Sequence, residues 1–225
     1  MVVIAAIVGF TAYKLEAGRS SPKLTPQQQA NALAVASGCP ASPTTRVNTL
    51  QWKKPPPMTI SKSGTYFAFV ETDLGSFTIS LDPAIAPATV NNFIFLADHG
   101  YYKCNAFDRV IPTFMNQTGD PTGTTSGSPG YTIPDEDQKK SANPSKQYPL
   151  GAVAMARTKL PHSGGAQFFI VAGPEGEGLA NSYALFGSVI SGMSVVERIN
   201  ADGSAAGIPP TVTHRIITIT ISNKG

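Results

Sequence analysis

The sequence is poor in charge. Only 14% of its 225 residues are Asp, Glu, Lys or Arg, whereas about a quarter is usual for a globular chain. The formal net charge is +3, and the basic residues form no Lys/Arg-rich block. This disfavours a basic face for nucleic acid, and we expect no nucleic-acid partner. The length allows one domain with a full core plus extensions.

The residue patterns of hydrolase and metal centres are also missing. No G-x-S-x-G and no H-E-x-x-H motif occurs, which disfavours a Ser-based hydrolase and a zinc protease. The acidic run at 135–137 is most simply a solvated turn. The chain has three histidines, none of them beside a nucleophile motif, namely His99, His162 and His214.

Glycines are frequent in the stretch 119–149, but they do not form a phosphate-binding motif. Neither G-x-x-x-x-G-K-[ST] nor G-x-G-x-x-G between a strand and a helix is present. A stretch of this length with little regular structure is usually a functional or binding loop. We therefore expect no cofactor.

Only two cysteines are present, Cys39 and Cys104. They lie far apart and belong to no C-x-x-C or Cys/His cluster, which makes a zinc site improbable. In an oxidising compartment they would pair, and closing so long a loop contributes about 4 kcal/mol in the chain-entropy model. Two free thiols are the alternative.

The N-terminus lacks a hydrophobic run long enough to cross a bilayer, which takes about 20 residues. Residues 2–13 are uncharged and largely apolar, and a run of this length matches the apolar part of a signal peptide. We predict that 1–13 is the remnant of a signal sequence or membrane anchor, with the true start upstream. A buried helix or strand is the alternative.

The predicted location follows from this segment. We expect a membrane-anchored or secreted domain outside the cytoplasm. The basic residues that come after the apolar segment argue for the alternative, a cytoplasmic domain, because basic residues favour the cytoplasmic side. A basic segment upstream would remove that conflict. The basic residues that follow the apolar segment are Lys14, Arg19 and Lys23.

Residues 14–62 are polar and rich in proline and are predicted to be a linker. Within them, 26–37 fits a short helix with Pro26 at its start and Gly38 as its stop. The prolines of 53–58 predict an extended spacer. The compact domain is expected over 63–225.

Alternating apolar residues predict eight short strands in this domain. Helical spacing of apolar residues predicts helices over 87–100 and 193–201. The predicted fold class is mainly β, a closed eight-stranded antiparallel barrel capped by two helices. The strands are expected at 65–73, 76–82, 105–111, 114–117, 151–156, 166–172, 184–190 and 211–222.

One of these strands places a guanidinium among apolar side chains. In "FDRVI", alternation puts Phe107, Arg109 and Ile111 on one face. In "AQFFIV", Gln167 and Phe169 share a face and the intervening phenylalanine takes the other. The residues alone leave open the alternative that Arg109 pairs with a carboxylate such as Asp120 while Phe169 is plain core.

Four segments carry a family resemblance. "FDRVIPTFMNQTGDPTG" looks like F-H-R-[IV]-I-P-G-F-M-x-Q-G-G-D, and "MARTKLPHSGGAQFFIV" looks like M-A-[NR]…S-Q-F-F-I in its bacterial form. "APATVNNFIFLADHGYY" and "YALFGSVISGMSVVERI" match a first helix and a strand with a second helix. In this order, over 66–222, they resemble the cyclophilin family of peptidyl-prolyl cis/trans isomerases, in its bacterial, membrane-anchored or secreted branch.

The resemblance implies an activity without cofactor or metal. An X–Pro bond must rotate against a barrier of about 18–20 kcal/mol that comes from amide resonance. By resemblance, Arg109 donates a hydrogen bond to the prolyl nitrogen, whose lone pair returns in the twisted amide. The partners implied are proline-containing proteins or peptides, bound by a monomer.

The remaining site residues are also implied by the resemblance. Gln117 would bond the substrate backbone, and Tyr183 would border the site where many eukaryotic members have His. The apolar pocket for the proline ring would consist of Phe114, Met115, Phe169 and Leu179. The groove for the extended peptide would be lined by Ala156, Arg157 and Gln167.

Departures from the family pattern lead to further expectations. Asp108 stands where His is common and should face away from the pocket, with a modest effect. Thr113 and Thr118 stand where Gly is common and are expected to shift the turn. Asn116 occupies a variable place. Gly178 stands where many members have Trp, so we expect an open pocket and weak binding of cyclosporin-type inhibitors.

Two other functions fit the same residues. One is a non-catalytic module of the cell envelope that binds proline peptides or acts as a chaperone. The other is a structural β-barrel domain. The combination of Arg109, Phe114, Gln117 and Phe169 favours catalysis over both.

Overall fold

The computed structural model describes residues 23–136 and 147–224. Eight strands and four helices follow one another in these ranges. The strands are β1 (Thr65–Thr72), β2 (Gly75–Leu81), β3 (Arg109–Ile111), β4 (Met115–Thr118), β5 (Ala152–Met155), β6 (Phe168–Val171), β7 (Leu185–Ser191) and β8 (Ile216–Lys224). The helices are α1 (Pro26–Ala36), α2 (Pro87–Asp98), α3 (Pro174–Glu177) and α4 (Met193–Ala201).

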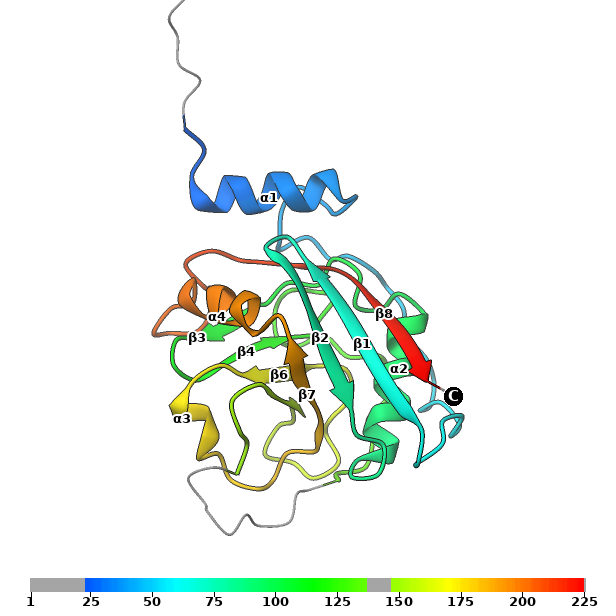
Figure 1. Ribbon diagram of the computed structural model, residues 1–225. Coiled ribbons are helices and arrows are strands. Elements are labelled where there is room, and N and C mark those ends of the chain that lie inside the picture. The colour runs from blue at the N-terminus through cyan, green and yellow to red at the C-terminus, as the bar shows by residue number, and fades with distance from the viewer. Residues whose placement is uncertain (1–22, 137–146, 225) are drawn as a thin grey trace, which may run out of the picture.

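The strands form one antiparallel sheet in the order β3-β4-β6-β5-β7-β2-β1-β8. The strands curve around the core, α2 and α4 lie on different sides of them, and α1 lies outside (Figure 1). This confirms the predicted mainly β class with eight antiparallel strands and the two capping helices. The one-turn helix α3 was not predicted.

Closure of the barrel stays a prediction. Its edge strands, β3 and β8, share no strand ladder among the described residues. The segments just before them meet in one antiparallel bridge, between Ala106 and Arg215. Two backbone hydrogen bonds flank this bridge, from Phe107 N to His214 O (2.9 Å) and from Ile216 N to Asn105 O (2.9 Å).

The core lies between α2 and the sheet and is rich in aromatic rings. Phe93 of α2 packs against Phe168 of β6 with ring centroids 5.4 Å apart, and against Phe186 of β7 at 5.2 Å. All three side chains are almost completely buried. Phe168 is thus the core member of the adjacent phenylalanines, as alternation predicts.

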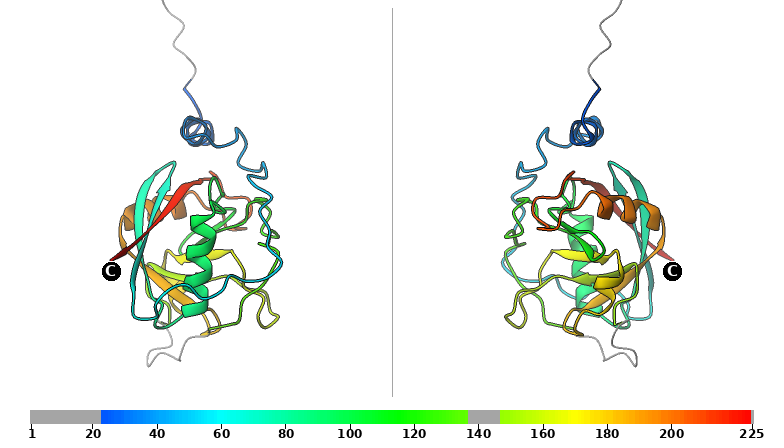
Figure 2. Two further views of the ribbon diagram at one scale, coloured as in Figure 1. Left: turned by 90° about the vertical axis from the view of Figure 1, so that its right-hand side faces the viewer. Right: turned by 90° about the vertical axis from the view of Figure 1, so that its left-hand side faces the viewer.

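Residues 38–62, here called the N-terminal arm, lie along the domain (Figure 2). The ring of Trp52 packs edge-on against Phe95 of α2, with centroids 5.1 Å apart, and its backbone N–H donates to the carbonyl of Pro129. Pro57 O accepts a hydrogen bond from Asn91. Residues 53–58 form no helix or strand and are mostly exposed, but Pro57 is in contact with α2, so the extended spacer predicted there stays a prediction.

Helix α1 is fastened to the domain at its far end. It begins at a capping box between Thr25 and Gln28 and is followed by Gly38 with φ +86°, close to the predicted limits. Just beyond it, the sulfur atoms of Cys39 and Cys104 are joined in a disulfide. Of the two thiol states that the sequence leaves open, the structure has the paired one.

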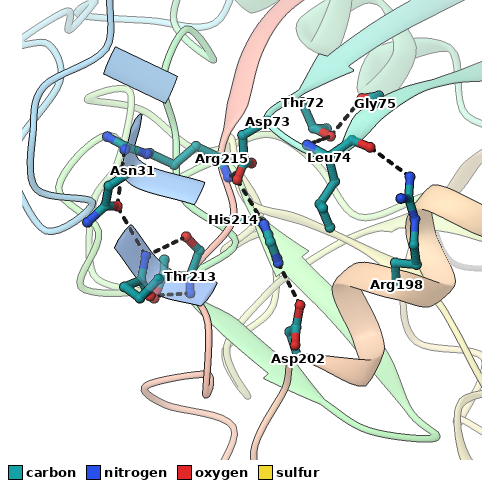
Figure 3. Close-up of polar contacts among 11 residues, drawn as sticks. Asn31, Thr72, Asp73, Leu74, Gly75, Arg198, Asp202, Thr213, His214 and Arg215 are labelled. Carbon is teal, nitrogen blue, oxygen red and sulfur yellow. Dashed lines mark hydrogen bonds and ion pairs between the residues drawn. The ribbon is translucent and has the colours of Figure 1, made fainter. Parts of the chain in front are cut away.

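A polar network also holds α1 (Figure 3). The buried guanidinium of Arg215 donates to Asn31 Oδ1 (3.2 Å) and to the carbonyl of Pro40. The side-chain amide of Gln27 exchanges two hydrogen bonds with the backbone of Thr213. These contacts tie α1 to the segment that leads into β8.

His214 lies next to this network between two carboxylates. Its Nδ1 is 2.9 Å from Asp73 Oδ2 and its Nε2 is 2.9 Å from Asp202 Oδ2 (Figure 3). Both ring nitrogens can donate only in the protonated imidazole. Burial alone would lower the pKa of His214, but the hydrogen bonds and charges of the two carboxylates raise it above its ordinary value.

No helix within 23–136 and 147–224 is long and apolar enough to cross a membrane. The predicted anchor at 1–13 lies outside the described residues.

Candidate active site

The predicted site residues surround two adjoining pockets. The small pocket has a volume of about 70 Å³. The large pocket, of about 350 Å³, is next to it and contains Gln167 in its lining. The small pocket is lined by Arg109, Phe114, Met115, Gln117, Ala156, Arg157, Phe169, Leu179 and Tyr183.

Arg109 enters the pockets from β3 because of strand alternation. Val110 is buried, whereas Arg109 and Ile111 are only partly covered on the opposite face. Arg109 is paired in register with Gln117 of β4, and its guanidinium donates to Gln117 Oε1 at 3.2 Å. It lines both pockets.

The guanidinium of Arg109 forms no ion pair with any described residue. Asp120, the partner considered from the sequence, accepts hydrogen bonds from its own loop instead, from Thr122 N (2.7 Å) and Gly127 N (2.9 Å). Because arginine has five N–H donors and Gln117 takes one, donors remain for a ligand.

Gln117 and Gln167, here called the glutamine pair, connect Arg109 to the loop beyond β4. Gln117 Nε2 donates to Gln167 Oε1 at 3.0 Å. Gln167 Nε2 donates to two backbone carbonyls, those of Thr125 (3.0 Å) and Gly127 (3.1 Å). The orientation of the guanidinium is thus fixed through two amides.

The apolar wall of the small pocket belongs to a second hydrophobic cluster, separate from the core around α2. Phe169 is 4% exposed, and its ring lies edge-on to that of Tyr183 with centroids 5.2 Å apart. Met115 is buried beside it, and Phe114 and Leu179 pack from the rim. The two adjacent phenylalanines therefore serve different clusters.

The acidic residues Asp135 and Glu136 correct one prediction. Asp135 accepts a hydrogen bond from Arg157 (3.1 Å) and one from the backbone N–H of His162 (2.8 Å). Glu136 accepts from Ala88 N (2.9 Å) and Thr89 N (2.8 Å), so it caps the N-terminus of α2, where N–H groups lack helical partners.

The prediction of a solvated turn is therefore wrong for Asp135 and Glu136. Asp137 lies outside the described residues. No group of three or more His, Cys, Asp or Glu side chains in the described part of the chain is arranged to hold a metal ion.

The departures from the family pattern have distinct structural outcomes. Thr113 adopts φ +64°, in the left-handed region that favours glycine, and its N–H donates to Asn200. Thr118 has no positive φ, and its buried hydroxyl donates to the carbonyl of Ala106. Asn116 is buried and bonded to α4. Only Thr113 therefore carries the strain expected of both threonines.

Gly178 ends α3 and does not line either pocket. Asp108 is buried, 5% exposed, and lines neither pocket, as expected. Phe107 was predicted to share the face of Arg109, but it is fully buried in the core with Val110, because the regular strand begins only at Arg109. Burial, followed by the charge of Asp120, raises the pKa of Asp108 to about 7. Its Oδ2 accepts the N–H of Thr125 at 3.0 Å.

Residues 120–127 lie in the stretch 119–149 that was expected to be a functional or binding loop, and Thr125 and Gly127 line the large pocket, but their contacts with Gln167 were not predicted. The signal available in the sequence was an aspartate followed by threonines at the second and fourth positions, which is typical of a turn held by side-chain oxygens. It did not reveal that two carbonyls of this turn would bind Gln167.

Comparison with known proteins places this geometry in a family. Residues 67–221 match the family model described as cyclophilin type peptidyl-prolyl cis-trans isomerase/CLD. The chain is 44% identical over 129 residues to peptidyl-prolyl cis-trans isomerase-like 1 of Aspergillus niger, covering 57% of this chain and 78% of that protein. It is 39% identical over 132 residues to peptidyl-prolyl cis-trans isomerase B of Bacillus subtilis, covering 59% and 88%.

Solved structures match the fold as well. A cyclophilin-type peptidyl-prolyl cis-trans isomerase of Cryptosporidium parvum has a TM-score of 0.64 at 28% identity and covers 72% of this chain and 99% of its own. A structure of it in the presence of the dipeptide Ala-Pro has a TM-score of 0.62 at 29% identity, covering 70% and 99%. Fungal and bacterial relatives both match, so similarity does not single out the predicted bacterial branch.

Proposed function

From the premise that the chain belongs to the family of cyclophilin-type peptidyl-prolyl cis-trans isomerases, we infer that its isomerase activity resides in the pockets around Arg109. The observation that carries this proposal is a guanidinium without a carboxylate partner among the described residues, fixed by Gln117 at the mouth of a small apolar pocket. A proline-containing segment of a protein is the substrate.

The chemistry requires only that the twisted amide bind better than the planar one. Rotation out of plane breaks amide resonance, and the prolyl nitrogen regains a lone pair that accepts a hydrogen bond. Arg109 donates that bond, because its guanidinium stays charged at every physiological pH and is already oriented. The interaction exists only in the transition state, so it lowers the barrier.

The apolar wall of the small pocket holds the proline ring, which does not rotate during the reaction. Phe114, Met115, Phe169 and Leu179 enclose the proline ring, while the carbonyl side of the bond turns toward the large pocket. Gln117 bonds the substrate backbone, and the groove beside Ala156 and Gln167 takes the residues before proline. No covalent step and no proton transfer is required.

NMR exchange spectroscopy of a proline peptide tests the proposal directly. Addition of the protein to a short Ala-Pro peptide is expected to raise the cis/trans exchange rate, observed by NMR without a coupling protease. Arg109→Ala is expected to lower kcat/KM by about 10²–10³-fold, the usual effect of removing one preorganised donor. Arg46→Ala, which removes an exposed arginine that lines neither pocket, is the matched control.

Binding without acceleration would instead identify a peptide-binding module. In that case the wild type would broaden the peptide resonances but leave the exchange rate unchanged. An Arg109→Ala protein as active as the wild type would refute the assigned role of the guanidinium.

We also propose that the protein acts outside the cytoplasm as a monomer of the bacterial, membrane-anchored or secreted branch. The disulfide between Cys39 and Cys104 supports this location, because disulfides persist in oxidising compartments. The apolar stretch at 2–13 supports attachment or export. Labelling of lysines with an impermeant reagent in intact and lysed cells tests it, and labelling only after lysis would contradict it.

A further inference from the structure

Asp108 is a buried carboxyl group that the proposed mechanism does not use. It directly precedes Arg109, the first residue of β3, and its side chain is 5% exposed and lines neither pocket. Its Oδ2 accepts the N–H of Thr125 at 3.0 Å, and its Oδ1 has no hydrogen-bond partner among the described residues. A buried acceptor of this kind is costly, so its position calls for a reason.

The loop that Asp108 contacts is held by a second carboxylate. Residues 120–127, here called the pocket loop, fold back on Asp120, which accepts the N–H groups of Thr122 (2.7 Å) and Gly127 (2.9 Å). A Cβ on Gly127 would collide with the carboxylate of Asp120. The pocket loop therefore rests on two carboxyl groups, one at each side.

A continuous path of hydrogen bonds leads from Asp108 to the guanidinium of Arg109. The peptide unit of Thr125 takes part through both ends, because its N–H donates to Asp108 and its carbonyl accepts from Gln167. From Gln167 the path continues to Gln117 and then to Arg109. The path begins and ends on adjacent residues, and between them it runs through Thr125, Gln167 and Gln117, which line the large pocket.

We propose that Asp108 is a positioning residue for the isomerase reaction, which orients the guanidinium of Arg109 through the pocket loop and the glutamine pair. This inference rests on the proposed function of Arg109. Asp108 itself lines neither pocket; it acts through Thr125, which lines the large one. Its protonation state decides how firmly the pocket loop is held.

The pKa values of the two carboxyl groups determine how pH acts on the pocket loop. Burial, followed by the charge of Asp120, raises the pKa of Asp108 to about 7. Burial would also raise the pKa of Asp120, but hydrogen bonds from Thr122 and from backbone N–H groups of the pocket loop lower it below its ordinary value. Asp120 therefore stays ionised while Asp108 titrates.

The other titratable groups near this pair do not change charge at neutral pH. Tyr101 faces Asp120, and burial raises its pKa above the ordinary value. Tyr131 faces Tyr101, and burial raises its pKa to about 12. Arg46 is the cation that faces Tyr101. The titration near neutrality consequently belongs to Asp108.

Ionisation of Asp108 strengthens its bond from the N–H of Thr125, but burial and the charge of Asp120 oppose ionisation more strongly, so the ionised form destabilises this arrangement of the pocket loop. Below pH 7 one neutral carboxyl and one carboxylate hold it. Above pH 7 two negative charges lie against the same loop, and the unpartnered Oδ1 of Asp108 becomes part of a buried anion. The carbonyls that bind Gln167 then shift, and the guanidinium loses its fixed orientation.

The pH profile of the reaction tests this. We expect kcat/KM of the wild type to fall by about fivefold as pH rises through 7, the factor that corresponds to one lost neutral hydrogen bond. Asp108→Asn keeps an oxygen for Thr125 and mimics the neutral carboxyl, so its profile should be flat at the high value. Asp108→Ala removes the acceptor and should be low at every pH.

Two controls separate positioning from other effects. His162→Asn removes the imidazole beside Asp135, and the pH step should persist, although histidines as a class titrate in this range. Urea unfolding of each variant gives its folded fraction. A step in the wild-type profile that survives in Asp108→Asn, or a flat wild-type profile, would overturn the proposal.

A second readout does not depend on activity. The side-chain amide resonances of Gln167 in a ¹⁵N–¹H spectrum should shift with a midpoint near pH 7 in the wild type and stay constant in Asp108→Asn. If the wild type accelerates no isomerisation, the proposed function fails, while these resonances still decide whether Asp108 controls the glutamine pair. Resonances of Gln167 that do not titrate would refute the path.

Discussion

Loss of the disulfide should destabilise the whole domain. Replacement of Cys39 and Cys104 by serine opens a loop with a sequence separation of 65 residues. In the chain-entropy model this loop corresponds to about 4 kcal/mol of unfolding free energy. For a chain of this size, each kcal/mol shifts Tm by about 2–4 °C, so we expect a fall of roughly 10 °C.

The sole tryptophan reports on the N-terminal arm separately. Trp52 packs against the rings of Phe95, His99 and Tyr101, so its fluorescence should change when the arm leaves α2. We expect urea transitions followed by this fluorescence and by circular dichroism to coincide in the wild type and to move together in the variant, because the arm and domain share buried contacts.

Reduction of the wild type with a thiol reagent should reproduce the effect of the double variant, and the reagent should leave that variant unchanged. A fall in unfolding free energy of less than about 1 kcal/mol would refute the view that the disulfide stabilises the protein by restricting the unfolded chain. Separate transitions for Trp52 and the backbone would show that the arm is an independent unit.

The remaining predictions concern stability and inhibition. The contribution of His214 to stability should be complete below its ordinary pKa of about 6.5 and should be lost as pH rises through the higher pKa of the folded protein; this is measured as the difference in unfolding free energy between wild type and His214→Gln over a pH series, and a difference that grows with pH would contradict it. Glu136→Ala should cost about 1 kcal/mol by removing the cap of α2, with Glu175→Ala, on the exposed face of α3, as the control. Cyclosporin-type inhibitors should bind weakly, because Gly178 supplies no indole; nanomolar inhibition of the isomerase would disprove this.

The sequence predicts the strands and the walls of the small pocket well because both depend on local patterns. Alternation alone places Arg109 opposite Val110, and it separates Phe168 from Phe169. The resemblance then assigns the remaining residues of the site, all of which line one of the two pockets.

What the sequence does not reveal depends on contacts between distant segments. Glu136 caps a helix that begins almost fifty residues earlier, as its bonds to Ala88 and Thr89 show. The arm appears polar and rich in proline, yet Trp52 finds three aromatic partners on the domain. Local propensity does not encode such contacts, because they form only when segments that are distant in sequence pack together in the fold.

The disulfide also determines how the domain would respond to mechanical force. Tension applied at α1 reaches the domain through the disulfide between Cys39 and Cys104 and through the bonds of α1 to Thr213 and Arg215. The covalent link bypasses the arm and strands β1 and β2, so the hydrogen bonds of Trp52 and Val47 to residues 121–129 lie outside it. A substrate groove built in this way keeps its shape while its point of attachment is pulled.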